Sequence, residues 1–253
     1  MNNRGTYSDT FCRFYDLIYK EKNYEGESRY IKDRIDKFHP DIKRVLELGC
    51  GTGNYSEILS QYGWNITGIE KSPDMIVQFQ KKKISNATII PSDLLNFRSP
   101  DPFDLVLALF NVIGYLLEDD QIQQCFQNVF QNLKAGGLFM FDLWNTEGVL
   151  FHQFQKKVKE AENSRYTITR HSNSAPLGIE NLVGVDFELF IQDKFTGEKY
   201  SARENHTIRH FSNREIKRFA ESAGLVLAQE EEFYSGFALG PTTWNAAYIL
   251  RKP

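Results

Sequence analysis

Val45-Leu46-Glu47-Leu48-Gly49-Cys50-Gly51-Thr52-Gly53 is the stretch that decides how the rest of the chain is organised. Its apolar residues predict a buried strand of a parallel sheet, and three glycines follow at alternate positions. A helical pattern then runs through Ile58, Leu59 and Tyr62. A strand, a tight glycine turn and a helix bring backbone N–H groups to a helix N-terminus with no side chains in the way. Open α/β sheets bind nucleotide-like ligands at such a corner, beside the carboxyl end of a strand.

The spacing of the glycines narrows the choice of ligand. A phosphate-binding P-loop needs Gly-Lys-Ser/Thr after four intervening residues, and the dinucleotide fingerprint spaces its last two glycines three apart. Here Gly51 and Gly53 are two apart, and no Gly-Lys-Ser/Thr follows. The pattern resembles the first motif of class I S-adenosylmethionine (SAM)-dependent methyltransferases, which implies that Glu47, Gly49, Gly51 and Gly53 bind the cofactor at its methionine part. Taken alone, the motif leaves open another nucleotide binder or a plain tight turn.

The composition is that of an ordinary globular protein of 253 residues, with 41% hydrophobic, 14% aromatic and 25% charged residues. The net charge of -3 argues mildly against a nucleic-acid partner, which usually requires a basic face. The three cysteines have neither disulfide nor zinc spacing, and we expect no metal site. The polar N-terminus lacks an apolar signal segment, and no run of roughly 18 apolar residues occurs. We therefore expect a soluble, cytoplasmic protein that does not span a membrane.

Two helices are expected before the first strand, because aromatic and aliphatic residues recur there at helical spacing. The first covers residues 7–20, with Tyr7 as the first residue of its apolar pattern, and the second covers about Tyr24–Phe38. Helices in this position would cover a ligand that is bound at the end of the first strand.

The same region carries a more specific pattern. Phe14-Tyr15-Asp16-Leu17-Ile18-Tyr19, followed by Lys22-Asn23-Tyr24, resembles the opening of the amino-sugar N,N-dimethyltransferases, which act on nucleotide-linked deoxysugars. The resemblance implies that Tyr15 and Tyr24 contact the cofactor and that Tyr19 lies beside the transferred methyl group. Core packing of a terminal helix is the alternative interpretation for Tyr15 and Tyr19.

A second strand is predicted at residues 64–70 and ends in Glu70, about twenty residues beyond the glycines. A carboxylate at this point can accept hydrogen bonds from both ribose hydroxyls of a bound nucleotide, whereas an exposed strand end is the plain alternative. Lys71 follows in the same turn and joins the expected cofactor residues. Ser72 and Pro73 then predict a helix start, which places Met75 either on the adenine or in the core.

Two further strand ends should complete the cofactor site. Residues 87–90 predict a third strand that leads to Asp93 and Leu94. Asp93 either accepts from the exocyclic amine of the adenine or caps its loop. Residues 103–110 predict a fourth, buried strand that ends at Phe110 and leads into segment 111–115, between cofactor and acceptor.

The strands alternate with helices, which predicts an α/β fold with a parallel sheet covered on both faces. The Lys-x-Gly-Gly turn at residues 134–137, before an apolar strand at 138–142, resembles the same point in class I methyltransferases. A capping box formed by Ser212 and Glu215 predicts another helix, and two strands, about 225–233 and 243–251, finish the chain. The resemblance implies a Rossmann-like sheet of seven strands with the last one antiparallel.

Residues 145–210 interrupt this scheme with apolar and polar residues in alternation, which predicts an antiparallel insertion after the fifth strand. We expect strands at about 166–171, 183–191 and 199–209. One face of the last strand carries Glu204 and His206, which we take as candidate catalytic residues in the roof of an acceptor pocket. Half-exposed sheet residues without a catalytic role are the alternative.

Together these patterns predict one methyltransferase domain over residues 1–253. It would transfer a methyl group from SAM to a small polar metabolite and release S-adenosylhomocysteine (SAH). The leading acceptor is the amino group of a nucleotide-linked deoxysugar. Such a reaction mainly requires alignment of the nucleophile with the methyl carbon.

Three alternatives stay open at this point. The first is O- or N-methylation of another small molecule, and the second is a SAM-binding protein that does not catalyse. The third is a Rossmann-like oxidoreductase, against which the glycine spacing and the lack of a second dinucleotide-binding half argue. As partners we expect a small-molecule acceptor, no nucleic acid and no membrane, and the resemblance suggests a homodimer.

Overall fold

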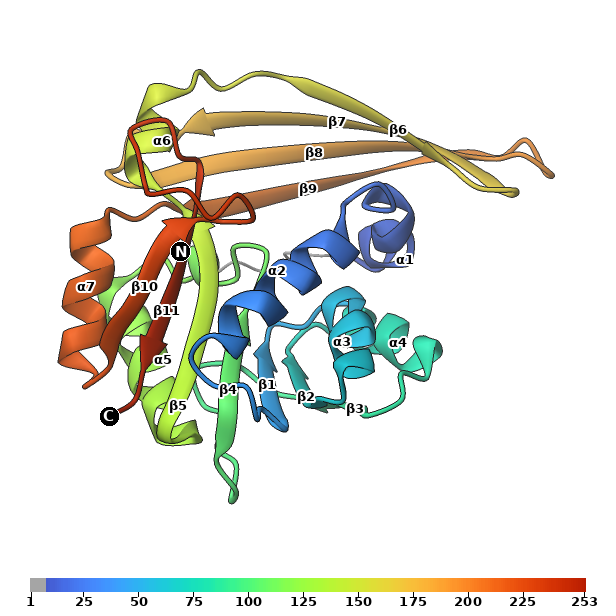
Figure 1. The fold of residues 1–253 in the computed structure, drawn as a ribbon. Helices are drawn as coiled ribbons and strands as arrows, with labels where there is room; N and C mark the ends of the chain where they lie inside the picture. The colour runs from blue at the N-terminus through green and yellow to red at the C-terminus, as the bar shows by residue number, and fades with distance from the viewer. Residues whose placement is uncertain (1–7) are drawn as a thin grey trace.

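The computed structural model describes residues 8–253, so the expectation for Tyr7 lies outside the described residues. Its centre is a seven-stranded sheet in the order β10-β11-β5-β4-β1-β2-β3 (Figure 1). Strand β11 is antiparallel to both of its neighbours, whereas β1 to β5 pair in parallel. The predicted class I sheet is therefore confirmed. Its strands are β1 (Arg44–Leu48), β2 (Asn65–Glu70), β3 (Ala87–Pro91), β4 (Phe103–Ala108), β5 (Leu133–Trp144), β10 (Val226–Glu232) and β11 (Asn245–Arg251).

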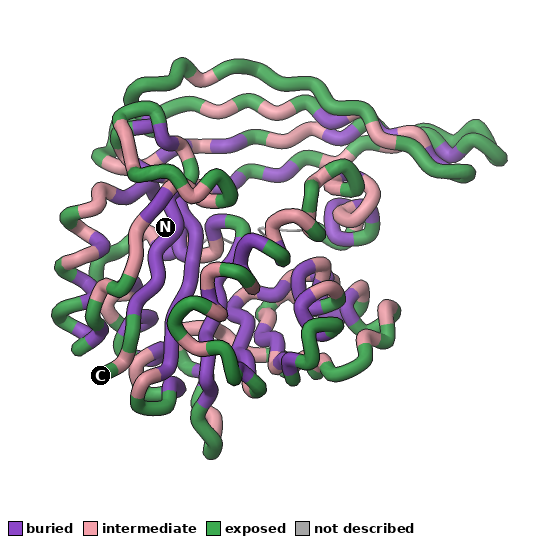
Figure 2. The backbone as a smooth tube through the Cα atoms, in the orientation of Figure 1, coloured by how far each residue is buried: buried purple, intermediate pink, exposed green. Residues whose placement is uncertain are grey.

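Helices cover both faces of this sheet, because successive residues of a strand point to opposite sides and both sides are apolar. Helix α2 (Tyr24–Asp36) and helix α3 (Asn54–Leu59), which continues as the short η1 (Ser60–Tyr62), pack on one face. Helices α5 (Asp119–Asn132) and α7 (Asn213–Ser222) pack on the other. All six residues of β4 are buried between the two layers, as Figure 2 shows for the centre of the sheet.

Local sequence signals set several element ends. Ser72 caps helix α4 (Pro73–Lys82) through its side chain, and Ser212 and Glu215 form the predicted capping box of α7. Strand β4 ends at Ala108, two residues earlier than predicted. The reason is that Phe110 and Asn111 both take left-handed backbone angles, with φ of 65° and 61°, which no strand can accommodate.

A second, antiparallel sheet lies across the carboxyl edge of the first and is called the roof here (Figure 1). It contains β6 (Lys157–Glu162), β7 (Tyr166–Pro176), β8 (Leu182–Asp193) and β9 (Lys199–Arg209), between α6 (Thr146–Phe151) and α7. Helix α1 (Asp9–Ile18) packs its Phe11, Phe14 and Ile18 against the inner face of the roof. The N-terminal helix and the insertion thus cover the carboxyl ends of the parallel strands together.

Strand β6 and helix α6 were not predicted. Five of the six residues of β6 are exposed because the strand lies at the edge of the roof, so it lacks the buried face that would produce an alternating pattern. Within residues 8–253, no helix combines the length and the apolar character needed to cross a bilayer.

Candidate active site

A cavity of about 740 Å³ lies at the carboxyl ends of β1 to β4, beside helices α1 and α2. Every residue predicted to bind the cofactor lines it except Gly53: Tyr15, Tyr24, Glu47, Gly49, Gly51, Glu70, Lys71, Met75, Asp93, Leu94 and Phe110. The three candidate catalytic residues, Tyr19, Glu204 and His206, lie outside this lining. The fold therefore brings the predicted cofactor residues to one place, while their individual roles stay predictions.

The three glycines of the first turn serve different purposes, although all have positive φ. A Cβ atom at Gly49 would come within 3.0 Å of the Val112 side chain, and one at Gly53 within 2.5 Å of the Phe79 ring. Gly53 is thus required for packing between α3 and α4 and does not line the cavity. A Cβ atom at Gly51 would meet nothing within 4 Å. Gly51 therefore keeps free the space that a ligand would need.

Glu70 is held in place by the backbone at the end of β2. Its Oε2 accepts from the Gly51 N–H at 3.0 Å, and its Oε1 accepts from the Lys71 and Ser72 N–H groups, both at 2.9 Å. A carboxylate oxygen can accept more than one hydrogen bond. Both oxygens are therefore fixed in position. Oε2 keeps an acceptor site for one ligand hydroxyl, and Oε1, which already accepts twice, would take a second hydroxyl by sharing.

Glu47 lies below the glycine turn, where it is buried and accepts a short hydrogen bond from the Ser56 hydroxyl. Burial raises the pKa of Glu47 to about 7, since a charge in this position loses its contact with water. The carboxyl group can therefore change its ionisation near neutral pH when a charged ligand binds.

Asp142, near the end of β5, was not identified as a site residue from the sequence. Its carboxylate accepts from the backbone N–H groups of Phe110, at 2.6 Å, and Asn111, at 3.2 Å. Both residues have left-handed backbone angles, a conformation that costs a bulky residue on the order of 1–3 kcal/mol. Asp142 thus positions the segment that forms the cavity wall, and burial raises its pKa to about 7.

Met75 was expected either on the adenine or in the core, and Asp93 either at the adenine amine or as a loop cap. The position of each residue is compatible with both of its expected roles. Met75 lines the cavity and is 2% exposed, so it also belongs to the core. Asp93 lines the cavity too, while its Oδ1 accepts from the Leu95 N–H at 2.9 Å and so caps its own loop.

Tyr19 packs among aromatic rings at the end of α1. Its ring centroid lies 4.7 Å from that of Tyr15 and 5.3 Å from that of Phe110, both of which line the cavity. Burial raises the pKa of Tyr19, and the nearby Arg170 opposes this rise by its charge and a hydrogen bond. The Tyr19 hydroxyl is accordingly neutral, and the rings of Tyr15 and Phe110 lie between Tyr19 and the cavity.

His206 is buried on the inner face of the roof and reaches the cavity through Tyr115. The Tyr115 hydroxyl lies 2.8 Å from Nδ1 of His206, and Tyr115 lines the cavity. Burial lowers the pKa of His206 to about 4, so the imidazole is neutral near pH 7. A neutral imidazole with its proton on Nε2 accepts at Nδ1, and the Tyr115 hydroxyl then donates to it. A phenolic oxygen whose proton is donated can itself accept a hydrogen bond.

Glu204 faces a different neighbour. It is 3% exposed, and its Oε1 accepts from the backbone N–H of Ser8 at 2.8 Å and from the Ser8 hydroxyl. Ser8 is the N-cap of α1, so Glu204 fastens this helix to the roof. Glu204 and His206 are both buried and not half-exposed, and a catalytic role for either stays a prediction.

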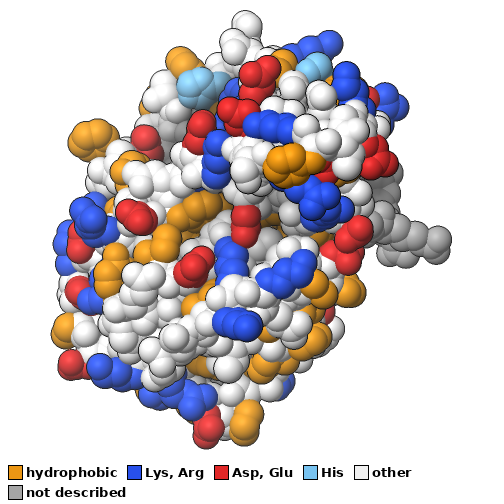
Figure 3. Space-filling model, turned by 90° about the vertical axis from the view of Figure 1, so that its right-hand side faces the viewer, with side chains coloured by type: hydrophobic (Ala, Val, Ile, Leu, Met, Phe, Trp, Pro, Cys, Tyr) orange, Lys and Arg blue, Asp and Glu red, His pale blue; other side chains and the backbone are white. Residues whose placement is uncertain are grey.

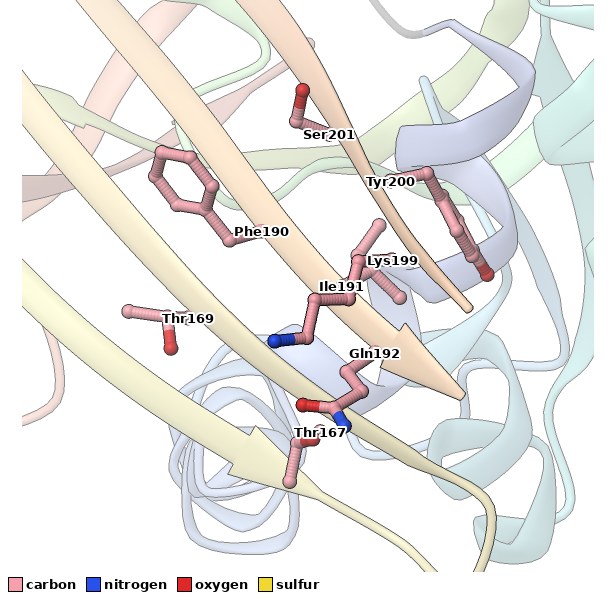
Figure 4. Close-up of a pocket in the computed structure, with 8 residues that line it drawn as sticks. All are labelled: Thr167, Thr169, Phe190, Ile191, Gln192, Lys199, Tyr200 and Ser201. Carbon is pink, nitrogen blue, oxygen red and sulfur yellow. The ribbon is translucent and has the colours of Figure 1, made fainter. Parts of the chain in front are cut away.

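A second cavity, of about 420 Å³, lies on the outer face of the roof and is shown in Figure 4. Its wall includes Thr167, Thr169, Phe190 and Gln192, whereas Tyr200 points away from it towards α1 (Figure 4). Its only ionisable side chains are those of Lys199 and Tyr200, and it lies on the face of the roof opposite to α1. Across residues 8–253, no cluster of side chains has the make-up of a metal site.

Comparisons with known proteins agree with this geometry. Residues 45–137 match the family model described as a methyltransferase domain. A dTDP-3-amino-3,4,6-trideoxy-alpha-D-glucopyranose N,N-dimethyltransferase of Streptomyces venezuelae is 25% identical over 227 residues, which cover 89% of this chain and 94% of the relative.

Two solved structures have the same fold. DesVI of Streptomyces venezuelae superposes with a TM-score of 0.81 at 23% identity, over 96% of this chain and 99% of that one. A SAM-dependent methyltransferase of Clostridium acetobutylicum gives a TM-score of 0.80 at 20% identity, over 96% and 98%. Residues 45–137 are therefore a methyltransferase domain, and the chain as a whole has the fold of these solved class I methyltransferase structures.

Proposed function

We propose that this chain transfers methyl groups from SAM to the amino group of a nucleotide-linked deoxysugar. The observation that carries this proposal is the extent of the match to the amino-sugar N,N-dimethyltransferase, which covers 89% of the chain. A match of this length extends well beyond the cofactor half at residues 45–137 and into the insertion that covers the acceptor side. We accordingly propose one domain over residues 1–253, in which residues 145–210 cover the acceptor.

The residues of the cavity fit the proposed cofactor. Gly51 leaves open space beside the turn, and Glu70 presents two fixed oxygens to the ribose hydroxyls. Glu47 lies where the methionine part would bind and can balance its ammonium group. When bound, SAM supplies a methyl group that is already activated by the positive charge on sulfur. The protein then has to align the nucleophile with that carbon and exclude water.

Tyr115 is the residue we propose to orient the acceptor amine. With the His206 proton on Nε2, the Tyr115 hydroxyl donates to Nδ1, and its oxygen accepts an N–H of the neutral amine. This contact directs the nitrogen lone pair towards the methyl carbon. In this scheme Tyr115 is a catalytic residue and His206 is a positioning residue, since His206 acts only through Tyr115. We propose that Tyr19 closes the opposite side of the reaction centre.

Turnover with a panel of acceptors tests the proposal. The purified protein is incubated with SAM and with a nucleotide-linked amino deoxysugar, its hydroxyl counterpart, the free amino sugar and simple alkylamines. We expect the mass of the nucleotide-linked amino sugar to increase by one and then two methyl groups, with no product from the hydroxyl counterpart. Product from the hydroxyl compound would favour O-methylation instead.

We further propose that the partners are small molecules, with no nucleic acid, and that the chain works in the cytoplasm as a homodimer. The net charge of -3 supports the first point, as does the mixture of acidic and basic side chains on the face shown in Figure 3. Three free cysteines suit a reducing compartment. The homodimer rests on the family resemblance alone, and light scattering of the purified chain tests it.

A further inference from the structure

Arg170 is a buried cation whose hydrogen-bonding groups are only partly used. It lies in β7 on the inner face of the roof and is 8% exposed. Its guanidinium group bonds to the Tyr19 hydroxyl, while its Nε and Nη1 have no hydrogen-bond partner. In the part of the chain that the structure describes, no carboxylate pairs with it. A guanidinium group stays charged inside proteins, so this charge has no carboxylate counter-ion within residues 8–253.

Another buried arginine shows what a structural role looks like in this fold. Arg209, also 8% exposed, forms ion pairs with Asp119 at 2.7 Å and with Glu215 at 2.9 Å. A buried charge without such a partner is strongly unfavourable. Aromatic rings offset part of this cost at Arg170, because its guanidinium carbon lies 5.1 Å from the Tyr19 ring and 5.2 Å from the Phe187 ring. These rings pack on the guanidinium group but leave its Nε and Nη1 donors without an acceptor.

The position of Arg170 relates it to the acceptor side of the cavity. On one side, Tyr19 connects it to Tyr15 and Phe110, which line the cavity. On the other side, the Phe187 ring lies 5.2 Å from the ring of His206, the partner of Tyr115. One side chain, Tyr19, thus separates Arg170 from the cavity lining on the first route, and two side chains, Phe187 and His206, separate it from the lining residue Tyr115 on the second.

We infer that Arg170 binds the diphosphate group of the acceptor. The planar fork of an arginine can donate two parallel hydrogen bonds to a phosphate group. Nε and Nη1 of Arg170 are buried donors without a hydrogen-bond partner in residues 8–253. In a nucleotide-linked sugar the diphosphate is separated from the amino group by one sugar ring. An acceptor whose amine meets Tyr115 therefore extends its diphosphate towards the roof. This inference rests on the proposed function and adds that the enzyme selects the nucleotide-linked sugar over the free one.

Binding measurements without turnover test the inference. The affinity of the SAH-saturated protein for thymidine diphosphate and for thymidine is measured by calorimetry, for the wild type and for Arg170→Met. We expect Arg170→Met to weaken thymidine diphosphate binding at least tenfold and to leave SAH binding unchanged. Thymidine, which lacks the diphosphate, should lose nothing from the substitution. Arg170→Lys keeps the charge without the fork and should give an intermediate affinity.

Arg203→Met is the matched control, because Arg203 lies on the outer face of the roof, where it pairs with Glu188 at 2.6 Å. Arg203→Met removes the same charge from the same sheet and should leave the affinity for thymidine diphosphate unchanged.

Melting temperatures separate a binding role from a structural one. Arg170→Met removes an unpaired buried charge and should melt no lower than the wild type, whereas loss of a structural ion pair would lower the melting temperature.

The outcomes distinguish this inference from the proposed function. If Arg170→Met binds thymidine diphosphate as tightly as the wild type, or if the wild type does not bind it, the inference is wrong, even where amino-sugar methylation is observed. If binding depends on Arg170 but no amino sugar on the panel is methylated, the inference stands and the proposed acceptor group is wrong. If Arg170→Met weakens thymidine and thymidine diphosphate equally, the arginine does not read the diphosphate and the inference fails.

Discussion

Removal of the Glu70 carboxylate should weaken cofactor binding and leave the fold intact. In Glu70→Ala the backbone N–H groups of Gly51, Lys71 and Ser72 lose their acceptor. All three residues are partly or fully exposed, so water can replace the carboxylate at a small cost in stability. The ribose loses two hydrogen bonds to a charged acceptor, worth about 1.5–3 kcal/mol each. The lower end of both gives about 3 kcal/mol, or roughly 150-fold in the dissociation constant of SAH.

Water in the space left by the side chain can recover part of this loss, so a tenfold effect is the least that we expect. Calorimetry with SAH and with its 2′,3′-dideoxy analogue gives a complete thermodynamic cycle between Glu70 and the hydroxyl pair. The wild type should bind SAH far more tightly than the analogue, and Glu70→Ala should bind both alike. If the variant still prefers SAH by the wild-type factor, the ribose hydroxyls bind elsewhere and the assignment of Glu70 is refuted.

The cofactor half of the site could be predicted because its signals are local in the sequence. Gly51 and Glu70 each follow a predicted strand directly, and parallel strands bring their carboxyl ends to one edge of the sheet. The two-residue spacing of Gly51 and Gly53 then argued against a phosphate or dinucleotide ligand and in favour of SAM. Even here the sequence did not separate the glycines by purpose, because only the packed structure shows that Gly53 faces Phe79 and not the cavity.

The acceptor half could be predicted only in part, because its contacts join distant segments. The faces of β9 followed from alternation, which placed Glu204 and His206 inside the roof. The partner of His206 is Tyr115, 91 residues earlier, and no local pattern indicates such a pair. Glu204 instead fastens the N-cap of α1, at Ser8. Arg170 gave no signal, since an arginine within a polar strand is usually exposed.

Four further predictions follow from the positions of single side chains. Gly51→Val should abolish SAH binding, since its side chain would fill the open space beside the turn and strain a backbone with φ of 55°; an unchanged calorimetric titration would contradict the motif assignment. Asp142→Asn turns an amide N–H against a backbone N–H of Phe110 or Asn111, so we expect a loss of about 1–3 kcal/mol in the free energy of unfolding, measured with denaturant. Tyr19→Phe should lower kcat more than it weakens SAM binding, because the hydroxyl acts in alignment; a lower melting temperature with wild-type kcat would assign Tyr19 to packing. SAH affinity should also depend on pH through Glu47. The pKa of this buried carboxyl group is raised from 4.5 to about 7, so below pH 7 the free protein holds a proton that must leave before the carboxylate can meet the cofactor's ammonium group. Affinity should therefore rise by up to about tenfold per pH unit as pH increases towards 7 and level off above it, with proton release on binding. The raised pKa also makes the free energy of unfolding depend on pH: the contribution of Glu47 is greatest below pH 4.5 and is lost as pH rises through 7. The free energy of unfolding is therefore measured over the same pH range as SAH affinity. Asp142 has a similarly raised pKa and could produce the same pH dependence, so Glu47→Gln is the control. The pH dependence of SAH binding should disappear in this variant. If it persists, Glu47 does not face the ammonium group.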